Sequence, residues 1–241
     1  MWTSFGALTG FSWLTGGVVE NVSAESWWIF QRALPVYGPC ARPLDLLQGD
    51  PPERWLLEVK APTGLHQVLG LFNWSEEPCT QRIAPAEWGI NAPEGALYFD
   101  FWQQTALGPA TELEVTLRPW SCRVLLIRSA GTMPTWVGSD RHVTGAIGLD
   151  RFSYDEATHT LTGECSGPAG STQRHYVYLP EGLQPLSAEG VAFEAPQYRL
   201  LQFTVELGDT GRRVWQVQLS PVRSSSGGGV GSAPPPHLPL S

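Results

Sequence analysis

Two aspartates, Asp45 and Asp100, have the residue type and the apolar surroundings that acid–base chemistry on a sugar would use. Glycoside cleavage needs two carboxyl groups about 5–10 Å apart, one as acid and one as nucleophile or base. Each aspartate also has a structural interpretation. Asp45 can bond backbone N–H groups or pair with Arg42, and Asp100 can cap the end of a strand. We favour the structural interpretation and assign no catalytic residue.

Other reactive side chains lack the patterns that catalysis or metal binding requires. No Gly-x-Ser-x-Gly elbow is present, and none of the histidines stands in a recognisable context with a serine or cysteine. There is no His-x-x-x-His pair, no Asp-rich calcium loop and no phosphate-binding glycine pattern. The sequence therefore predicts no metal and no cofactor.

The four cysteines are spaced about forty residues apart, without a C-x-x-C pair, which argues against a zinc knuckle or a redox dithiol. They are Cys40, Cys79, Cys122 and Cys165. Buried free thiols are the favoured interpretation, and two long-range disulfides in an exporting cell are the alternative.

Tryptophan is unusually abundant, with 11 in 241 residues. Aromatic rings fill protein cores, and their faces also pack against the apolar face of a sugar. Three lie in or beside strand patterns and are expected in the core: Trp102, Trp120 and Trp215. Three others stand in turn-like contexts where exposure is an alternative to covering a sheet end: Trp74, Trp88 and Trp136.

From about Arg54 the sequence has short strands separated by turn clusters, which is typical of an antiparallel β-sandwich. Apolar residues alternate with polar ones over 111–117, which predicts a half-buried strand. Similar alternation over 201–207 and 215–219, with a Gly-Asp-Thr-Gly turn at 208–211, predicts a hairpin.

The first fifty residues follow a different pattern. The Gly-interrupted apolar segment from Phe5 to Val19 is compatible with a strand buried on both faces. Ser23 is a candidate N-cap for a helix whose apolar face carries Trp27, Phe30 and Leu34. This single βα unit cannot bury its own faces, so it is expected to be the end of something larger.

The fold class expected is therefore mainly β: an antiparallel sandwich, in one or two lobes, preceded by one βα unit. The predicted domains are 1–50 for the βα unit and its linker, 51–130 for the first lobe and 131–221 for the second. The composition of 222–241, rich in Ser, Gly and Pro, predicts a disordered tail.

Charge and hydropathy limit the partners. The formal net charge is −8 and Lys60 is the one lysine, so nucleic acid and anionic membranes are not expected to bind. No apolar stretch reaches the roughly 20 residues of a membrane-spanning helix. Because no basic residue precedes Arg32 and no cleavage site follows an apolar run, we expect a cytoplasmic location.

Several phrases in colinear order carry a family resemblance. They are Leu8–Gly17, Ala41–Leu46, Val68–Ser75, Trp88–Ile90, Tyr98–Trp102, Leu117–Leu126 and Gly138–Gly145. This order over about residues 5 to 220 resembles the C-terminal portion of α-galactosidase-like glycoside hydrolases, the melibiase-type enzymes of clan D. In that family a (β/α)8 barrel carries the active site and a β-sandwich follows it.

The resemblance implies that 8–17 is the last barrel strand, so that Trp13, Thr15 and Gly16 are candidate substrate contacts at its C-terminal end. A complete barrel takes about 250 residues, so this chain cannot also contain the strands that bear the catalytic aspartates. We therefore expect a region of an enzyme for α-galactosides or related α-glycosides that is inactive alone. Two alternatives are a carbohydrate-binding module and a structural domain that packs against the missing barrel portion.

Overall fold

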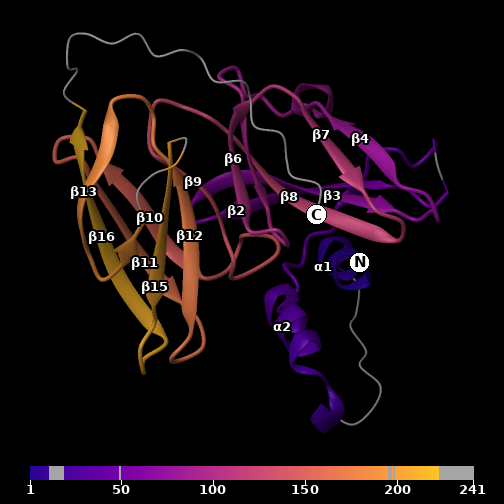
Figure 1. Ribbon diagram of the computed structural model, residues 1–241, viewed down its shortest axis with the longest axis horizontal. Coiled ribbons are helices and arrows are strands. Elements are labelled where there is room, and N and C mark those ends of the chain that lie inside the picture. Colours follow the sequence, from indigo (N-terminus) through magenta and orange to yellow (C-terminus); the bar gives the residue numbers. More distant parts are fainter. Residues whose placement is uncertain (11–18, 49, 195–196, 198, 223–241) are drawn as a thin grey trace.

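The computed structural model describes residues 1–10, 19–48, 50–194, 197 and 199–222. It consists mainly of antiparallel β-sheets with two short helices near the N-terminus (Figure 1), which confirms the expected fold class in its main feature. Every strand pair among the described residues is antiparallel.

The first half of the chain forms a six-stranded sheet and a two-stranded sheet. The six-stranded sheet has the order β1 (Arg42–Pro43), β2 (Arg54–Ala61), β3 (Gly64–Asn73), β8 (Ser121–Ser129), β5 (Ala96–Asp100), β6 (Thr105–Ala110). The two-stranded sheet pairs β4 (Cys79–Ile83) with β7 (Leu113–Leu117), and the 3₁₀-helix η2 (Pro85–Trp88) follows β4.

The second half forms two four-stranded sheets that face each other. One has the order β14 (Ala192–Phe193), β15 (Leu200–Glu206), β12 (Thr172–Tyr178), β9 (Thr135–Ser139). The other has the order β10 (Leu149–Asp155), β11 (Thr160–Ser166), β16 (Arg212–Pro221), β13 (Leu183–Glu189).

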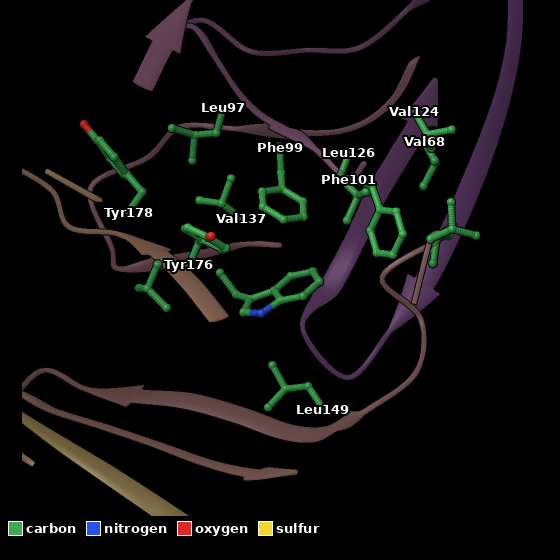
Figure 2. Close-up of a cluster of buried hydrophobic side chains, with 14 of the residues drawn as sticks. Val68, Leu97, Phe99, Phe101, Val124, Leu126, Val137, Leu149, Tyr176 and Tyr178 are labelled. Carbon is green, nitrogen blue, oxygen red and sulfur yellow. The ribbon is translucent and has the colours of Figure 1, made fainter. Parts of the chain in front are cut away.

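Both faces of the six-stranded sheet are buried, because strand alternation sends successive apolar side chains into two different cores. Leu69 and Leu125 point toward β4 and β7 and belong to the smaller core. Val68, Phe99 and Leu126 belong to the larger core, which continues into the second half of the chain. Figure 2 shows these three side chains in one cluster with residues of β9, β10 and β12.

Glycine allows the two halves to approach closely. A Cβ atom at Gly138 on β9 would overlap the ring of Phe99 on β5. Phe99 also contacts Tyr176 of β12, with ring centroids 4.9 Å apart (Figure 2). The two halves therefore share one continuous apolar core.

The predicted hairpin at 201–219 is wrong about pairing, although both predicted faces are buried. β15 pairs with β12 and β14, whereas β16 pairs with β11 and β13 in the opposite sheet. Phe203 and Trp215 meet across the sandwich with ring centroids 4.6 Å apart. The glycine turn at 208–211 thus connects two sheets, because each strand finds its hydrogen-bond partners elsewhere.

The expected strand from Phe5 to Val19 is also wrong over its first residues. Residues Trp2–Thr9 form helix α1, which ends at Gly10 in the left-handed conformation, with φ 69°. Phe5 and Leu8 lie on one helical face, and a Cβ at Gly70 of β3 would overlap the Leu8 side chain. The helix forms because this spacing buries its apolar face on the sheet. Residues 11–18 lie outside the described part of the chain.

The second helix, α2 (Ala24–Ala33), confirms the prediction of its start. The Ser23 hydroxyl oxygen accepts a hydrogen bond from the Ser26 N–H at 3.1 Å. The short 3₁₀-helix η1 (Val19–Asn21) precedes it. Its predicted apolar face is only partly covered, since Trp27 is 41% exposed, Leu34 is 38% exposed and Phe30 is half-buried.

Two sequence-based predictions remain untested, the domain boundaries and the disordered tail. The domain boundaries at 50, 130 and 221 stay predictions, and the tail from 223 onward lies outside the described residues. None of the described helices is both long enough and apolar enough to cross a bilayer.

Candidate functional site

Asp45 has the structural role that the sequence favoured. Its Oδ2 accepts a hydrogen bond from the Glu53 N–H at 3.1 Å, and its Oδ1 accepts one from the Arg54 N–H at 3.2 Å. Arg54 is the first residue of β2 and Glu53 directly precedes it, so the carboxylate closes the loop between β1 and β2. A carboxylate that accepts two backbone bonds serves as an anchor for this loop.

Asp100 also has a structural role, at the end of β5. Its Oδ2 lies 2.6 Å from Nη1 of Arg123 on β8, and its Oδ1 accepts a hydrogen bond from the Gln103 N–H at 3.1 Å. The Asp100 side chain is 1% exposed and that of Arg123 is 11% exposed. Burial raises the pKa of Asp100, while the Arg123 guanidinium opposes that shift. The pair therefore holds the turn after β5.

The candidate substrate contacts Trp13, Thr15 and Gly16 lie outside the described residues, so their surroundings stay a prediction. Over the described ranges, no group of three or more His, Cys, Asp or Glu side chains is placed to hold a metal ion.

Two buried histidines are fixed in one tautomer each by their partners. His66 Nε2 donates to the Thr144 carbonyl at 2.8 Å, and its Nδ1 accepts from Arg128 Nη2 at 3.1 Å. His142 Nε2 donates to the Pro35 carbonyl at 3.0 Å, and its Nδ1 lies 2.9 Å from the Thr144 hydroxyl. Burial, assisted by Arg128, lowers the pKa of His66 to about 3, and burial lowers the pKa of His142 to about 4. Both imidazoles are therefore neutral near pH 7.

A third buried histidine contacts a thiol. His175 Nδ1 accepts from Trp136 Nε1 at 3.2 Å, which leaves Nε2–H directed to Cys165 Sγ at 3.4 Å. Trp215 Nε1 donates to the same sulfur at 3.2 Å. Both Cys165 and His175 are 0% exposed. Burial raises the pKa of the Cys165 thiol to about 12 and lowers the pKa of His175 to about 3. A buried neutral thiol of this kind packs in the core and is not a nucleophile.

The four cysteines are free thiols, as the sequence favoured, but their burial differs. Cys165 is buried, Cys79 and Cys122 are half-buried, and Cys40 is exposed. The expectation of four buried thiols is therefore correct for one of them.

The burial of the tryptophans differs from the prediction at three positions, Trp120, Trp136 and Trp102. Trp215 is buried as expected, but Trp120, expected in the core, is 57% exposed and sits in a turn with φ 51°. Trp136, expected in a turn-like context, is 1% exposed and lies on β9. Trp102 is half-buried and donates from Nε1 to the Ser4 hydroxyl oxygen at 2.8 Å.

A cleft of about 790 Å³ lies beside α2 and is the largest of the described hollows. Its apolar wall comes from α2 and the residues after it: Trp27, Trp28, Phe30, Leu34 and Pro35. Its polar wall comes from the segment that follows β9 and from the start of β12 with the residue before it: Asp140, Arg141, Ser171 and Thr172. The lower end of β12 faces α2 in Figure 1.

The segment after β9 fastens the end of α2. Arg141 Nη1 donates to the Gln31 carbonyl at 2.9 Å, and the Val143 N–H donates to the Arg32 carbonyl at 2.8 Å. These donors satisfy carbonyl groups that the last helical turn leaves without intrahelical partners. The cleft therefore has fixed walls. Sequence reasoning missed it because its two walls are more than a hundred residues apart along the chain.

The comparisons with known proteins give a low-level structural similarity to glycoside hydrolases. Isomalto-dextranase from Arthrobacter globiformis T6, solved with panose, has a TM-score of 0.43 and 14% identity, covering 90% of this chain and 46% of that one. α-Galactosidase I from Mortierella vinacea has a TM-score of 0.43 and 15% identity, covering 53% of this chain and 34% of that one. The chain thus spans less than half the length of these structures. No protein-family model matches the chain, and no curated protein matches it.

Proposed function

We propose that this chain is the C-terminal β-rich region of a glycoside hydrolase that acts on α-galactosides or related α-glycosides. In this proposal the chain supplies the sandwich, and the catalytic carboxyl groups belong to barrel strands outside it. It does not catalyse hydrolysis by itself.

One observation carries the proposal. The phrases that resemble the family are scattered along the sequence but meet in space: 68–75 includes most of β3, 117–126 includes much of β8, and 98–102 includes the end of β5. These three strands are neighbours in the order β3-β8-β5. The phrase at 138–145 begins at Gly138, which packs on Phe99. The resemblance therefore concerns one contiguous core.

The surroundings of the two candidate carboxylates support the proposal that this chain does not catalyse hydrolysis by itself. Asp45 bonds two backbone N–H groups, and Asp100 is buried against Arg123. A general acid must reach the glycosidic oxygen, and a carboxylate committed to such partners is poorly placed to do so.

The test compares the chain with the longer reading frame that the proposal requires. We expect the DNA upstream of the Met1 codon to continue in frame through further strand–helix units. The product of that frame should release nitrophenol from an aryl α-glycoside, whereas the purified chain should not. Asp45→Asn in the longer product should retain kcat, and Asp100→Asn should retain kcat per folded molecule, with the folded fraction measured by circular dichroism. Turnover by the chain alone, or an upstream stop codon with no barrel units, would refute the proposal.

A carbohydrate-binding module without an associated hydrolase is the second candidate. The observation that favours it is the cleft beside α2, where exposed indole and polar side chains lie together. This candidate predicts sugar binding by the chain whether or not a barrel precedes it.

A further inference from the structure

We propose that the cleft beside α2 binds a short, neutral oligosaccharide. The inference rests on the carbohydrate-directed function proposed above and adds a binding site lined by residues of this chain. The cleft measures about 790 Å³, within the roughly 300–1,000 Å³ typical of small-molecule sites. It combines an aromatic wall with a few polar groups, which is the usual composition of such sites.

Trp27 is the side chain that offers an aromatic face. It is 41% exposed, and its ring contact within the described residues is an edge contact with Phe30 at 6.4 Å. Trp28 is equally exposed, but its ring is engaged by the Arg32 guanidinium at 4.0 Å and by Trp102 at 5.8 Å. The apolar C–H face of a pyranose ring would therefore pack on Trp27, while Trp28 supports the wall.

The polar wall favours a neutral ligand over an anion. The guanidinium groups of Arg32 and Arg141 share the cleft with the carboxylate of Asp140. The cleft also lies at the C-terminal end of α2, where the helix dipole adds about half a negative charge. The positive and negative charges around the cleft are therefore close to balance, and the polar wall offers both hydrogen-bond donors and hydrogen-bond acceptors. This pairing suits vicinal hydroxyl groups, which donate and accept at adjacent atoms.

The walls are held in place before any ligand arrives. Arg141 and Val143 bond the carbonyl groups of Gln31 and Arg32, and Asp140 Oδ1 accepts a hydrogen bond from the Arg174 N–H at 2.9 Å. A ligand that enters a preformed site does not have to order these groups, so less of its binding free energy is lost.

The experiment is a calorimetric titration of the intact chain with stachyose, a neutral oligosaccharide with α-galactosyl units. Trigalacturonate serves as the acidic counterpart. We expect saturable binding of stachyose and weaker binding of trigalacturonate. Trp27→Ala should weaken stachyose binding by about tenfold or more, as for a central aromatic contact. The control is Trp120→Ala, which removes another exposed indole outside the cleft and should leave the affinity unchanged.

Four results would overturn the inference. They are the absence of saturable binding, equal effects of the two variants, tighter binding of trigalacturonate, and concentration-dependent dimerisation abolished by Trp27→Ala. The last result would assign the cleft to a second copy of the chain. None of them affects the activity test of the longer reading frame, so the failure of this site and the failure of the proposed function are distinguishable. Circular dichroism of both variants checks that each is folded.

Discussion

Lowering the pH should destabilise this protein through three neutral, buried histidines. The pKa is lowered to about 3 for His66, about 4 for His142 and about 3 for His175, in each case mainly by burial. An unfolded histidine titrates near pH 6.5, so between these values the unfolded state binds more protons than the folded state. The contribution of these three histidines to the free energy of unfolding is therefore fully present above about pH 7 and is lost as the pH falls toward 4.

The magnitude follows from the pKa differences. At pH 5.5, protonation of each histidine stabilises the unfolded state by about 1.4 kcal/mol, whereas the same histidine in the folded state stays neutral. The three groups together lower the free energy of unfolding by about 4 kcal/mol between pH 7.5 and pH 5.5, if they act independently. Burial raises the pKa of Asp100 and of Asp140, and those shifts have the opposite sign, so they offset part of the loss at the acid end.

The assay is urea unfolding followed by circular dichroism at pH 7.5 and pH 5.5. His142→Gln keeps an N–H donor but removes the titrating group, so its pH-dependent loss should be smaller than that of the original chain by about 1.4 kcal/mol. Trp120→Ala, which removes an exposed side chain without a titrating group, is the control and should leave the loss unchanged. If the original chain loses less than about 1 kcal/mol, or His142→Gln changes nothing, the buried imidazoles are not neutral as inferred. His66→Gln repeats the test if His142→Gln does not fold.

The remaining predictions concern packing, a buried ion pair and a helix cap, each measured by the same unfolding assay at pH 7.5. Gly138→Ala should cost about 1–3 kcal/mol because the new methyl group overlaps Phe99, whereas Gly131→Ala, with no atom within 4 Å of the added Cβ, should change little. Equal effects of these two changes would contradict the close packing of β9 on β5. Asp100→Ala should cost about 3–5 kcal/mol because it leaves a largely buried guanidinium without its partner, and a loss below 1 kcal/mol would contradict the structural role. Ser23→Ala should cost about 1 kcal/mol as the loss of an N-cap, and no change would mean that the cap is not formed.

The sequence was sufficient to predict which residues of the strands are buried, but not which strands pair. Alternation at 201–207 and at 215–219 predicts one buried face for each strand, and in each strand the predicted face is buried. Pairing depends on backbone hydrogen bonds to β12 and β11, which leave no mark in the side-chain pattern. A glycine turn between two alternating runs is equally compatible with a hairpin and with a crossing between sheets.

The N-terminal region shows where a short apolar run misleads. Glycines within 5–19 suggested a strand, yet Phe5 and Leu8 are also spaced for one face of a helix, and Gly70 of β3 leaves room for that helix. Because that room is created some sixty residues downstream, tertiary packing decides between the two local structures. In α2 the cap residue Ser23 was sufficient to locate the start.

The candidate site illustrates a different limit. Asp45 and Asp100 were visible because they stand in apolar segments, and both prove to be bonded to the backbone or to Arg123. The cleft was not visible, because Trp27 and Arg141 come together only through the fold. The one signal available was the excess of tryptophan, which does not indicate which of the rings are exposed.

The central strands of the six-stranded sheet serve two cores at once, and this has a consequence for how the protein melts. If the chain were cut near Ala130, the face of that sheet that carries Phe99 would lose its contacts with β9 and β12. Its apolar side chains would then be exposed to water. Neither piece should therefore be soluble alone. The intact polypeptide should behave as a single cooperative unit, with one calorimetric peak in which both halves are lost together.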